Sequence, residues 1–240
     1  MQHILSLVRK VCEEYDLIQE DDKIAVGISG GKDSLVLLTA LAKMQRFYPK
    51  KYSVVAINVD MFNGKTDTSK LENYCKTLGV EFEKVDSQIK EIVFDIRKEK
   101  NPCSLCAKLR RGILNSTAKK LGCNKVALGH HKDDLIDTFF LSLFYEGRLS
   151  TFAPITYLSN SDLYIIRPMI YVNESEISSS CKKYEMPVIK NLCPVDKKTE
   201  REHIKELLKT IKKEIPISKE RCFKAIVSPE RYNLFDKYKK

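Results

Sequence analysis

The sequence lacks the features that mark membrane and secreted proteins. No stretch of 18 consecutive apolar residues occurs, so no segment is long enough for a membrane-spanning helix. The first residues place Glu13, Glu14 and Asp16 close behind Leu5 and Val8, which is not the pattern of a secretory signal peptide. The chain also shows no internal repeat and no low-complexity tract. These absences predict a cytoplasmic protein that makes no membrane contact.

Positive charge is distributed unevenly along the 240 residues. The formal net charge is +10, and residues 182–240 contain 17 Lys/Arg and 9 Asp/Glu, a net +8, which leaves +2 for residues 1–181. Because basic segments attract nucleic-acid phosphates, this part of the chain predicts RNA contact, with a solvated lysine-rich helix as the alternative. The length suits one main domain with an appendage, and we expect a domain over residues 1–150 and a C-terminal extension over 151–240.

Strand-like apolar runs alternate with helical apolar stripes through the first 145 residues. This alternation predicts an α/β fold with a parallel sheet covered by helices on both faces. After Gly147 we expect a loop, a short strand at 164–167, helices at 173–184 and 199–214, and a loosely attached basic tail over 215–240. In the first part the expected strands are 23–28, 52–59, 81–85 and 125–128, and the expected helices are 3–17, 33–46, 68–78, 104–121 and 133–145.

A glycine-rich turn joins the first expected strand to the next helix and reads Ser29-Gly30-Gly31-Lys32-Asp33-Ser34. Such a turn presents backbone N–H groups and the positive end of a helix to an anion, typically phosphate. The usual P-loop is excluded, because Asp33 stands where Ser or Thr is required and Val26 stands where Gly is required. The glycines at 27, 30 and 31 lack the dinucleotide-binding spacing as well. The turn therefore predicts a nucleotide site of another kind, with an unliganded turn as the less favoured alternative.

Two further polar clusters follow expected strands, at Asp60 and at Gly129–Asp134. Ligands of parallel sheets bind at the carboxyl ends of the strands. The three clusters therefore predict a single active site at one edge of the sheet.

Eight cysteines in a reducing compartment are expected to be free thiols or metal ligands. Cys103 and Cys106 form a Cys-x-x-Cys pair at an expected helix start. No second pair of this kind exists, which weakens structural zinc, and the pair follows three strands, which weakens a thioredoxin-like site. An iron–sulfur cluster would need at least one more thiolate, for which the loop residue Cys193 is a candidate. The remaining cysteines, expected to be small core residues, are Cys12, Cys75, Cys123, Cys181 and Cys222.

These segments together resemble a known family. The Ser29–Ser34 loop is similar to that of the ATP pyrophosphatase (PP-loop) superfamily, whose members cleave ATP between the α and β phosphates and adenylate a substrate. From about residue 20 to 195 the resemblance is to TtcA-type tRNA 2-thiocytidine synthetases. It is carried further by Cys103-Ser-Leu-Cys106, Leu109-Arg110-Arg111-Gly112-Ile113-Leu114, Gly129-His130-His131-Lys132-Asp133-Asp134 and Ile166-Arg167-Pro168-Met169. The chain departs from the family where Pro194-Val195-Asp196 follows Cys193, which leaves the nucleoside open.

The resemblance implies an ATP-dependent tRNA sulfurtransferase that adenylates a nucleobase carbonyl and replaces its oxygen with sulfur, with 2-thiolation of cytidine 32 as the leading expectation. It implies Mg²⁺, ATP and a 4Fe-4S cluster on Cys103, Cys106 and Cys193, with one iron open to exogenous sulfide. The implied phosphate ligands are Ser29, Gly30, Gly31 and Ser34, with Lys32 neutralising pyrophosphate, Asp33 and Asp134 in Mg²⁺ or positioning roles, and Asp60, Gly129 and His130 on the nucleotide. Arg110 or Arg111 stabilises the adenylate or contacts RNA, and His130 and His131 are scaffolding in the alternative interpretation.

Other functions fit parts of this pattern. A 2-thiouridine synthetase or a thionucleobase desulfidase would share the cluster, and a lysidine-type or amide-forming PP-loop ligase would share only the ATP site. A non-catalytic iron–sulfur RNA-binding or redox protein would need no ATP. The expected partners are tRNA and a sulfur donor, either a cysteine desulfurase or sulfide, and the sequence leaves a homodimer open.

Overall fold

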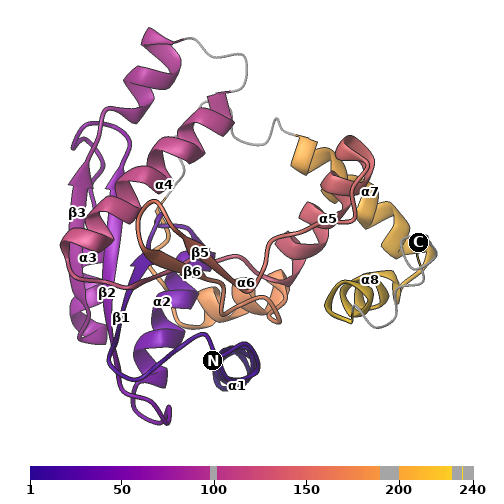
Figure 1. Cartoon of the computed structure of the whole chain (residues 1–240), viewed down its shortest axis with the longest axis horizontal. Helices are drawn as coiled ribbons and strands as arrows, with labels where there is room; N and C mark the ends of the chain where they lie inside the picture. The colour runs from indigo at the N-terminus through magenta and orange to yellow at the C-terminus, as the bar shows by residue number, and fades with distance from the viewer. Residues whose placement is uncertain (98–101, 190–199, 229–233, 235–240) are drawn as a thin grey trace. The chain divides into compact units, whose positions relative to one another are not determined.

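The computed structural model describes residues 1–97, 102–189, 200–228 and 234 (Figure 1). The described residues form two compact units: the first is drawn from 1–131 and 153–193, and the second from 132–152 and 194–240. The functional division at residue 150 remains a prediction. The two compact units do not follow this division, because the segment that begins at residue 153 belongs to the first unit.

One six-stranded sheet forms the centre of the first unit, in the order β3-β2-β1-β4-β6-β5. All neighbouring pairs are parallel except β5 and β6, which pair antiparallel. The four strands expected before residue 130 are confirmed, whereas β5 lies in a segment predicted to be a loop. The strands are β1 (Asp22–Gly27), β2 (Tyr52–Asp60), β3 (Glu81–Asp86), β4 (Lys125–Ala127), β5 (Ile155–Leu158) and β6 (Leu163–Ile166).

Helices cover both faces of this sheet, as predicted. On one face Leu114 and Ala118 of α4 pack on Ala25, Val55 and Ile57. Strand side chains alternate between faces, so the residues between these point to the other side, where α2 packs against β1 and β2. Nearly every residue of α2 is buried, because α1 and α6 cover its outer surface. The helices of this unit are α1 (Gln2–Glu14), α2 (Lys32–Met44), α3 (Ser69–Leu78), the π-helix η1 (Glu91–Ile96), α4 (Pro102–Lys120) and α6 (Glu174–Lys183).

In the part that the structure describes, the second unit contains three helices: α5 (Lys132–Glu146), α7 (Glu200–Glu214) and α8 (Ser218–Val227). Both α7 and α8 pack against α5. The expectation of a loose tail from residue 215 is therefore wrong for 218–227, which is an ordered helix with specific partners. No helix in the described part of the chain is long and apolar enough to cross a membrane.

Candidate nucleotide and cysteine site

The turn between β1 and α2 is folded by its own hydrogen bonds. Ser34 Oγ donates to the Gly31 carbonyl at 2.9 Å and accepts from the Ser29 N–H at 3.2 Å. Gly30 has a φ of +80°, a left-handed conformation that favours glycine, and its carbonyl accepts the Ile189 N–H at 2.9 Å. Among the described residues no side chain caps α2 at Gly31. The first turn of α2 therefore keeps N–H groups for an anion.

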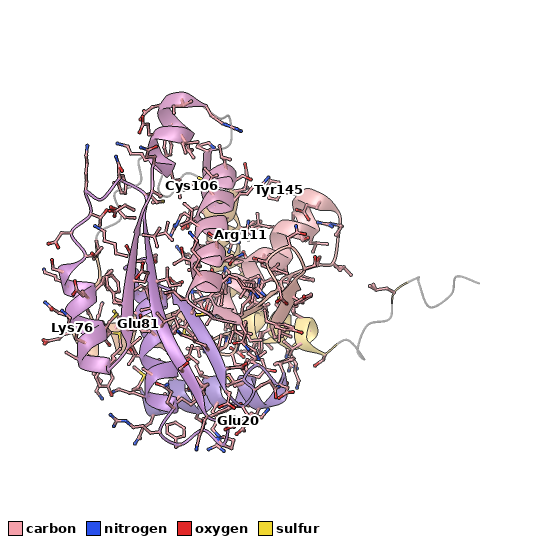
Figure 2. The ribbon with its side chains drawn as sticks, turned by 60° about the vertical axis from the view of Figure 1, so that its left-hand side comes forward. Glu20, Lys76, Glu81, Cys106, Arg111 and Tyr145 are labelled. Atoms are coloured by element: carbon pink, nitrogen blue, oxygen red, sulfur yellow. The ribbon has the colours of Figure 1, made fainter. Side chains whose placement is uncertain are left out.

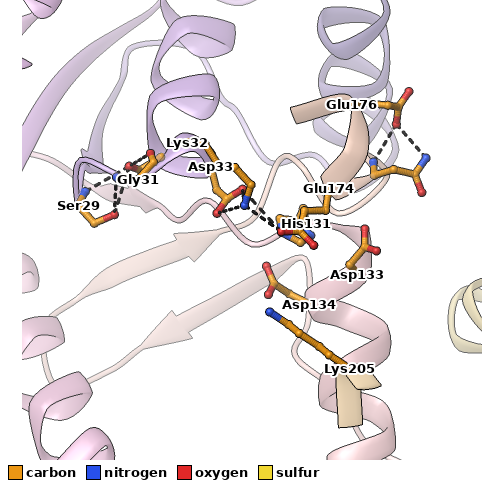
Figure 3. Close-up of polar contacts among 12 residues, drawn as sticks. Ser29, Gly31, Lys32, Asp33, His131, Asp133, Asp134, Glu174, Glu176 and Lys205 are labelled. Carbon is orange, nitrogen blue, oxygen red and sulfur yellow. Dashed lines mark hydrogen bonds and ion pairs between the residues drawn. The ribbon is translucent and has the colours of Figure 1, made fainter. Parts of the chain in front are cut away.

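Lys32, the first residue of α2, is held between two carboxylates. Its ammonium donates to Glu174 Oε1 at 2.9 Å and lies 3.1 Å from Asp33 Oδ1, as Figure 3 shows. Burial alone would lower the pKa of Lys32, but Glu174 and Asp33 outweigh it and the pKa is raised. Lys32 is thus cationic at neutral pH. Sequence reasoning missed Glu174, since no motif or spacing links it to a loop 142 residues earlier.

The segment after β4 reaches this loop, as predicted from the ends of the strands. A Cβ on Gly129 would lie 3.1 Å from the carbonyl carbon of Asp33 and 3.2 Å from the nitrogen of Ser34, so only glycine fits without displacing the loop. His131 is buried, and its Nε2 lies 3.7 Å from Asp33 Oδ1. His130, half-buried, lies between Gly129 and His131 in the chain.

A pocket of about 230 Å³ opens beside the loop. Asp60 lies in its wall, but its carboxylate is already engaged: it accepts the N–H of Phe62 at 3.0 Å and both the N–H and Oγ1–H of Thr66, at 3.2 and 2.6 Å. Burial would raise the pKa of Asp60, and these hydrogen bonds lower it instead. Asp60 therefore shapes the pocket by fixing the loop that follows β2. The pocket is lined by Ser29, Gly31, Asn58, Val59, Asp60, Met61, Phe62, Thr66, Arg110 and Ile189.

The Cys-x-x-Cys pair lies at the start of α4, directly after Pro102. Cys103 is exposed and Cys106 is half-buried. Figure 2 labels Cys106 on this helix. Cys106 Sγ lies 3.5 Å from the sulfur of Met61, which lines the pocket. Cys106 therefore lies next to a residue in the wall of the pocket that Ser29 and Gly31 of the phosphate loop also line.

The other described cysteines are poor candidates for metal ligands. Burial raises the pKa of Cys12 to about 12 and that of Cys75 to about 11, and it also raises the pKa of Cys123, Cys181 and Cys222. A metal binds the thiolate, which these environments disfavour. The four with the deepest burial confirm the core prediction. Cys193, the predicted third ligand, lies outside the described residues, and within them no group of three His, Cys, Asp or Glu side chains could hold a metal ion.

In the second unit, the three charged residues that begin α5 are paired with the C-terminal helices. Glu220 of α8 binds the buried Lys132 ammonium at 2.6 and 2.8 Å. Lys219 lies 2.5 Å from Asp133, and Arg201 of α7 lies 3.4 Å from Asp134. The sequence predicted a role for Asp134 but gave no sign of these partners. Its assignment to Mg²⁺ or positioning stays a prediction.

Known proteins match this chain over most of its length. A family model described as PP-loop domain matches residues 2–214. The tRNA-cytidine(32) 2-sulfurtransferase of Ralstonia pickettii is 38% identical over 213 residues, which is 88% of this chain and 68% of that protein. The enzyme of the same name from Citrifermentans bemidjiense is 36% identical over 237 residues, 98% of this chain and 93% of its own. The U34-tRNA thiolase NcsA from Methanococcus maripaludis, solved with its 4Fe-4S cluster, superposes with a TM-score of 0.78 at 25% identity, covering 97% of this chain and 80% of that one.

Proposed function

Because the chain belongs to the PP-loop family and, within it, to the tRNA-cytidine(32) 2-sulfurtransferases, we propose that it is an ATP-dependent, AMP-forming enzyme that thiolates C2 of cytidine 32 in tRNA. The observation that carries the proposal is the contact between Cys106 and Met61. It places Cys106 beside Met61, which lines the same pocket as Ser29 and Gly31. An activating nucleotide and a sulfur-handling group can therefore serve one nucleobase.

The reaction has to overcome a poor leaving group, the C2 carbonyl oxygen. Attack of this oxygen on the α-phosphorus of ATP forms an O–P bond and breaks the bond to the β-phosphate, which releases pyrophosphate. A sulfide then forms a C–S bond at C2, and the C–O bond breaks with AMP as the leaving group. Both steps require phosphates held in place and negative charge neutralised.

The roles of the loop residues follow from these needs. We assign Ser29, Gly30, Gly31 and Ser34 to phosphate binding at the N-terminus of α2, and Lys32 to neutralisation of the departing pyrophosphate. Asp33 is assigned to Mg²⁺, which prefers carboxylates together with phosphate oxygens. The adenosine is assigned to the pocket shaped by Asp60, near Gly129 and His130, and Arg110 on the pocket wall is assigned to the adenylate.

The exposed thiol of Cys103 and the half-buried thiol of Cys106 suit a 4Fe-4S cluster, and we assign Cys193 as the third ligand. When bound, such a cluster with three protein ligands supplies one open iron that can hold a sulfide. Sulfur then comes from a cysteine desulfurase or from free sulfide. We assign the basic C-terminal segment, and α7 in particular, to tRNA phosphates.

The runner-up is 2-thiolation of uridine, since NcsA is a U34-tRNA thiolase. Mass spectrometry of tRNA nucleosides from a strain lacking the gene separates the two. The proposal predicts loss of 2-thiocytidine with 2-thiouridine unchanged, and reappearance of 2-thiocytidine on complementation. Loss of 2-thiouridine alone would favour the runner-up, and an iron-free protein that stayed active would favour a ligase.

A further inference from the structure

The partner of Lys32 on α6 is held by a well-defined helix start. Glu174 is the first residue of α6, which begins with a capping box: Glu176 Oε2 accepts the Asn173 N–H at 2.8 Å and the Asn173 side-chain amide at 2.9 Å. The body of α6 packs against α2, the helix that begins with Lys32. The two helix starts are therefore fixed relative to each other. This packing places Glu174 Oε1 2.9 Å from the Lys32 ammonium (Figure 3).

This contact places two anions in competition for one cation. A phosphate group at the N-terminus of α2 needs the Lys32 ammonium, and Glu174 already accepts a hydrogen bond from it. A carboxylate and a phosphate that both lie beside Lys32 repel each other. Water screens this repulsion incompletely, because the Lys32 and Glu174 side chains are only 30% and 41% exposed. Binding of phosphate and binding of Glu174 therefore oppose each other.

We propose that Glu174 is a positioning residue that competes with phosphate for the Lys32 ammonium, and that it thereby weakens the hold of the loop on pyrophosphate. The inference rests on the proposed function, in which pyrophosphate leaves before sulfur can be transferred. Glu174 returns Lys32 to its contact with α6 as the product departs. The residue touches no reacting atom and acts only through Lys32.

The test is a measurement of pyrophosphate affinity on the full-length protein by titration calorimetry with Mg²⁺ and pyrophosphate. Glu174→Gln keeps the size of the side chain and removes its charge, and it should tighten pyrophosphate binding by about 2- to 5-fold, the range of a part-exposed ion pair. Glu174→Asp keeps the charge and should stay close to the parent. Glu185→Gln is the matched control, because it removes the same charge from an exposed residue just beyond the other end of α6.

A double-mutant cycle distinguishes competition from simple charge removal. In a Lys32→Ala background, Glu174→Gln should have little of its original effect, because no ammonium remains to compete for. Equal tightening with and without Lys32, equal tightening in Glu185→Gln, or no tightening in Glu174→Gln would each overturn the inference and leave the proposed function standing. A parent protein that binds no pyrophosphate would instead contradict the proposed function, and with it this inference.

Discussion

At the scale of single residues, the candidate site works by placing charge. Lys32 supplies a cation at a helix start that already favours anions, and Asp33 beside it supplies a carboxylate within 3.1 Å. We predict that Lys32→Ala and Asp33→Ala abolish release of AMP and pyrophosphate, because the first leaves the charge of the departing pyrophosphate without its cation and the second removes a ligand of the metal ion. The visible absorption of the anaerobic protein should be unchanged, since Cys103 and Cys106 lie on another helix, α4. Release of ADP by the parent protein would contradict α–β cleavage.

Asp137 gives a pH-dependent prediction within the second unit. It is 4% exposed, its Oδ2 has no hydrogen-bond partner among the described residues, and burial raises the pKa of Asp137 from 3.8 to about 7 despite Lys205 and Arg201 nearby. The unfolded chain ionises this group near pH 4, whereas the folded chain resists ionisation until about pH 7. Ionisation of Asp137 therefore lowers the free energy of unfolding progressively as the pH rises between these values. The loss of stability is complete above about pH 7.

The matching experiment is thermal unfolding of Asp137→Asn at pH 5 and pH 8. The gain in melting temperature over the parent should be larger at pH 8, where the parent must hold a buried charge. Asp21→Asn, an exposed surface control, should change the melting temperature equally little at both values. A gain for Asp137→Asn that is independent of pH would show that ionisation of this carboxyl does not limit stability.

Residue types and spacing predicted the loop, the cysteine pair and the polar residues at the strand ends, because each is a local pattern with a chemical purpose. The partners of these residues could not be predicted. Glu174 meets Lys32 only through the packing of α6 on α2, and Asp60 was expected near adenosine without a sign that Thr66 and Phe62 would bind its carboxylate. Side-chain contacts between distant segments depend on how the elements pack in the folded protein, and the spacing of apolar residues along the sequence does not predict that packing.

At the scale of elements, α4 connects the cysteine pair, assigned to sulfur transfer, with the sheet that carries the nucleotide site. Leu114 and Ala118 fix it to the sheet, and its N-terminal end carries Cys103 and Cys106, of which Cys106 contacts Met61 in the wall of the pocket. The same scale shows where periodicity fails. β5 is a short strand of mixed exposure with no alternation to detect, and α8 is exposed over much of its surface and is anchored by ion pairs that a hydrophobic pattern does not reveal.

The cysteine pair at the start of α4 carries a prediction about metal content. Protein purified without oxygen should be brown and contain about four irons and four inorganic sulfides per chain. Cys103→Ser and Cys106→Ser should each lose most of both, because a serine hydroxyl is a poor replacement for a thiolate. Cys222→Ser, a half-buried cysteine in the second unit, is the control and should retain them. Stoichiometric zinc without sulfide would contradict the cluster.

At the scale of the whole molecule, charge separates the parts of the chain. The net +8 of residues 182–240 contrasts with the +2 of the rest, and Lys212 and Lys213 lie exposed in the last turn of α7. If α7 binds tRNA, neutralising both lysines should reduce the slope of log affinity against log salt by roughly one unit for each phosphate that the protein no longer neutralises. Filter binding across a salt series measures this slope. An unchanged slope would contradict tRNA binding by α7 and would favour Lys108, Arg110 and Arg111 on α4 as the RNA-binding residues.

The most direct test of the central claim is the stoichiometry of a single reaction. Anaerobic protein is incubated with unmodified tRNA, Mg²⁺, ATP and sulfide, and AMP is counted against thionucleoside at each position by mass spectrometry. The proposed function predicts one AMP for each 2-thiocytidine, and it predicts that the 2-thiocytidine forms at position 32. A tRNA that carries uridine at position 32 should yield no 2-thiocytidine. AMP release without thiolation, or 2-thiocytidine formed without ATP, would contradict it.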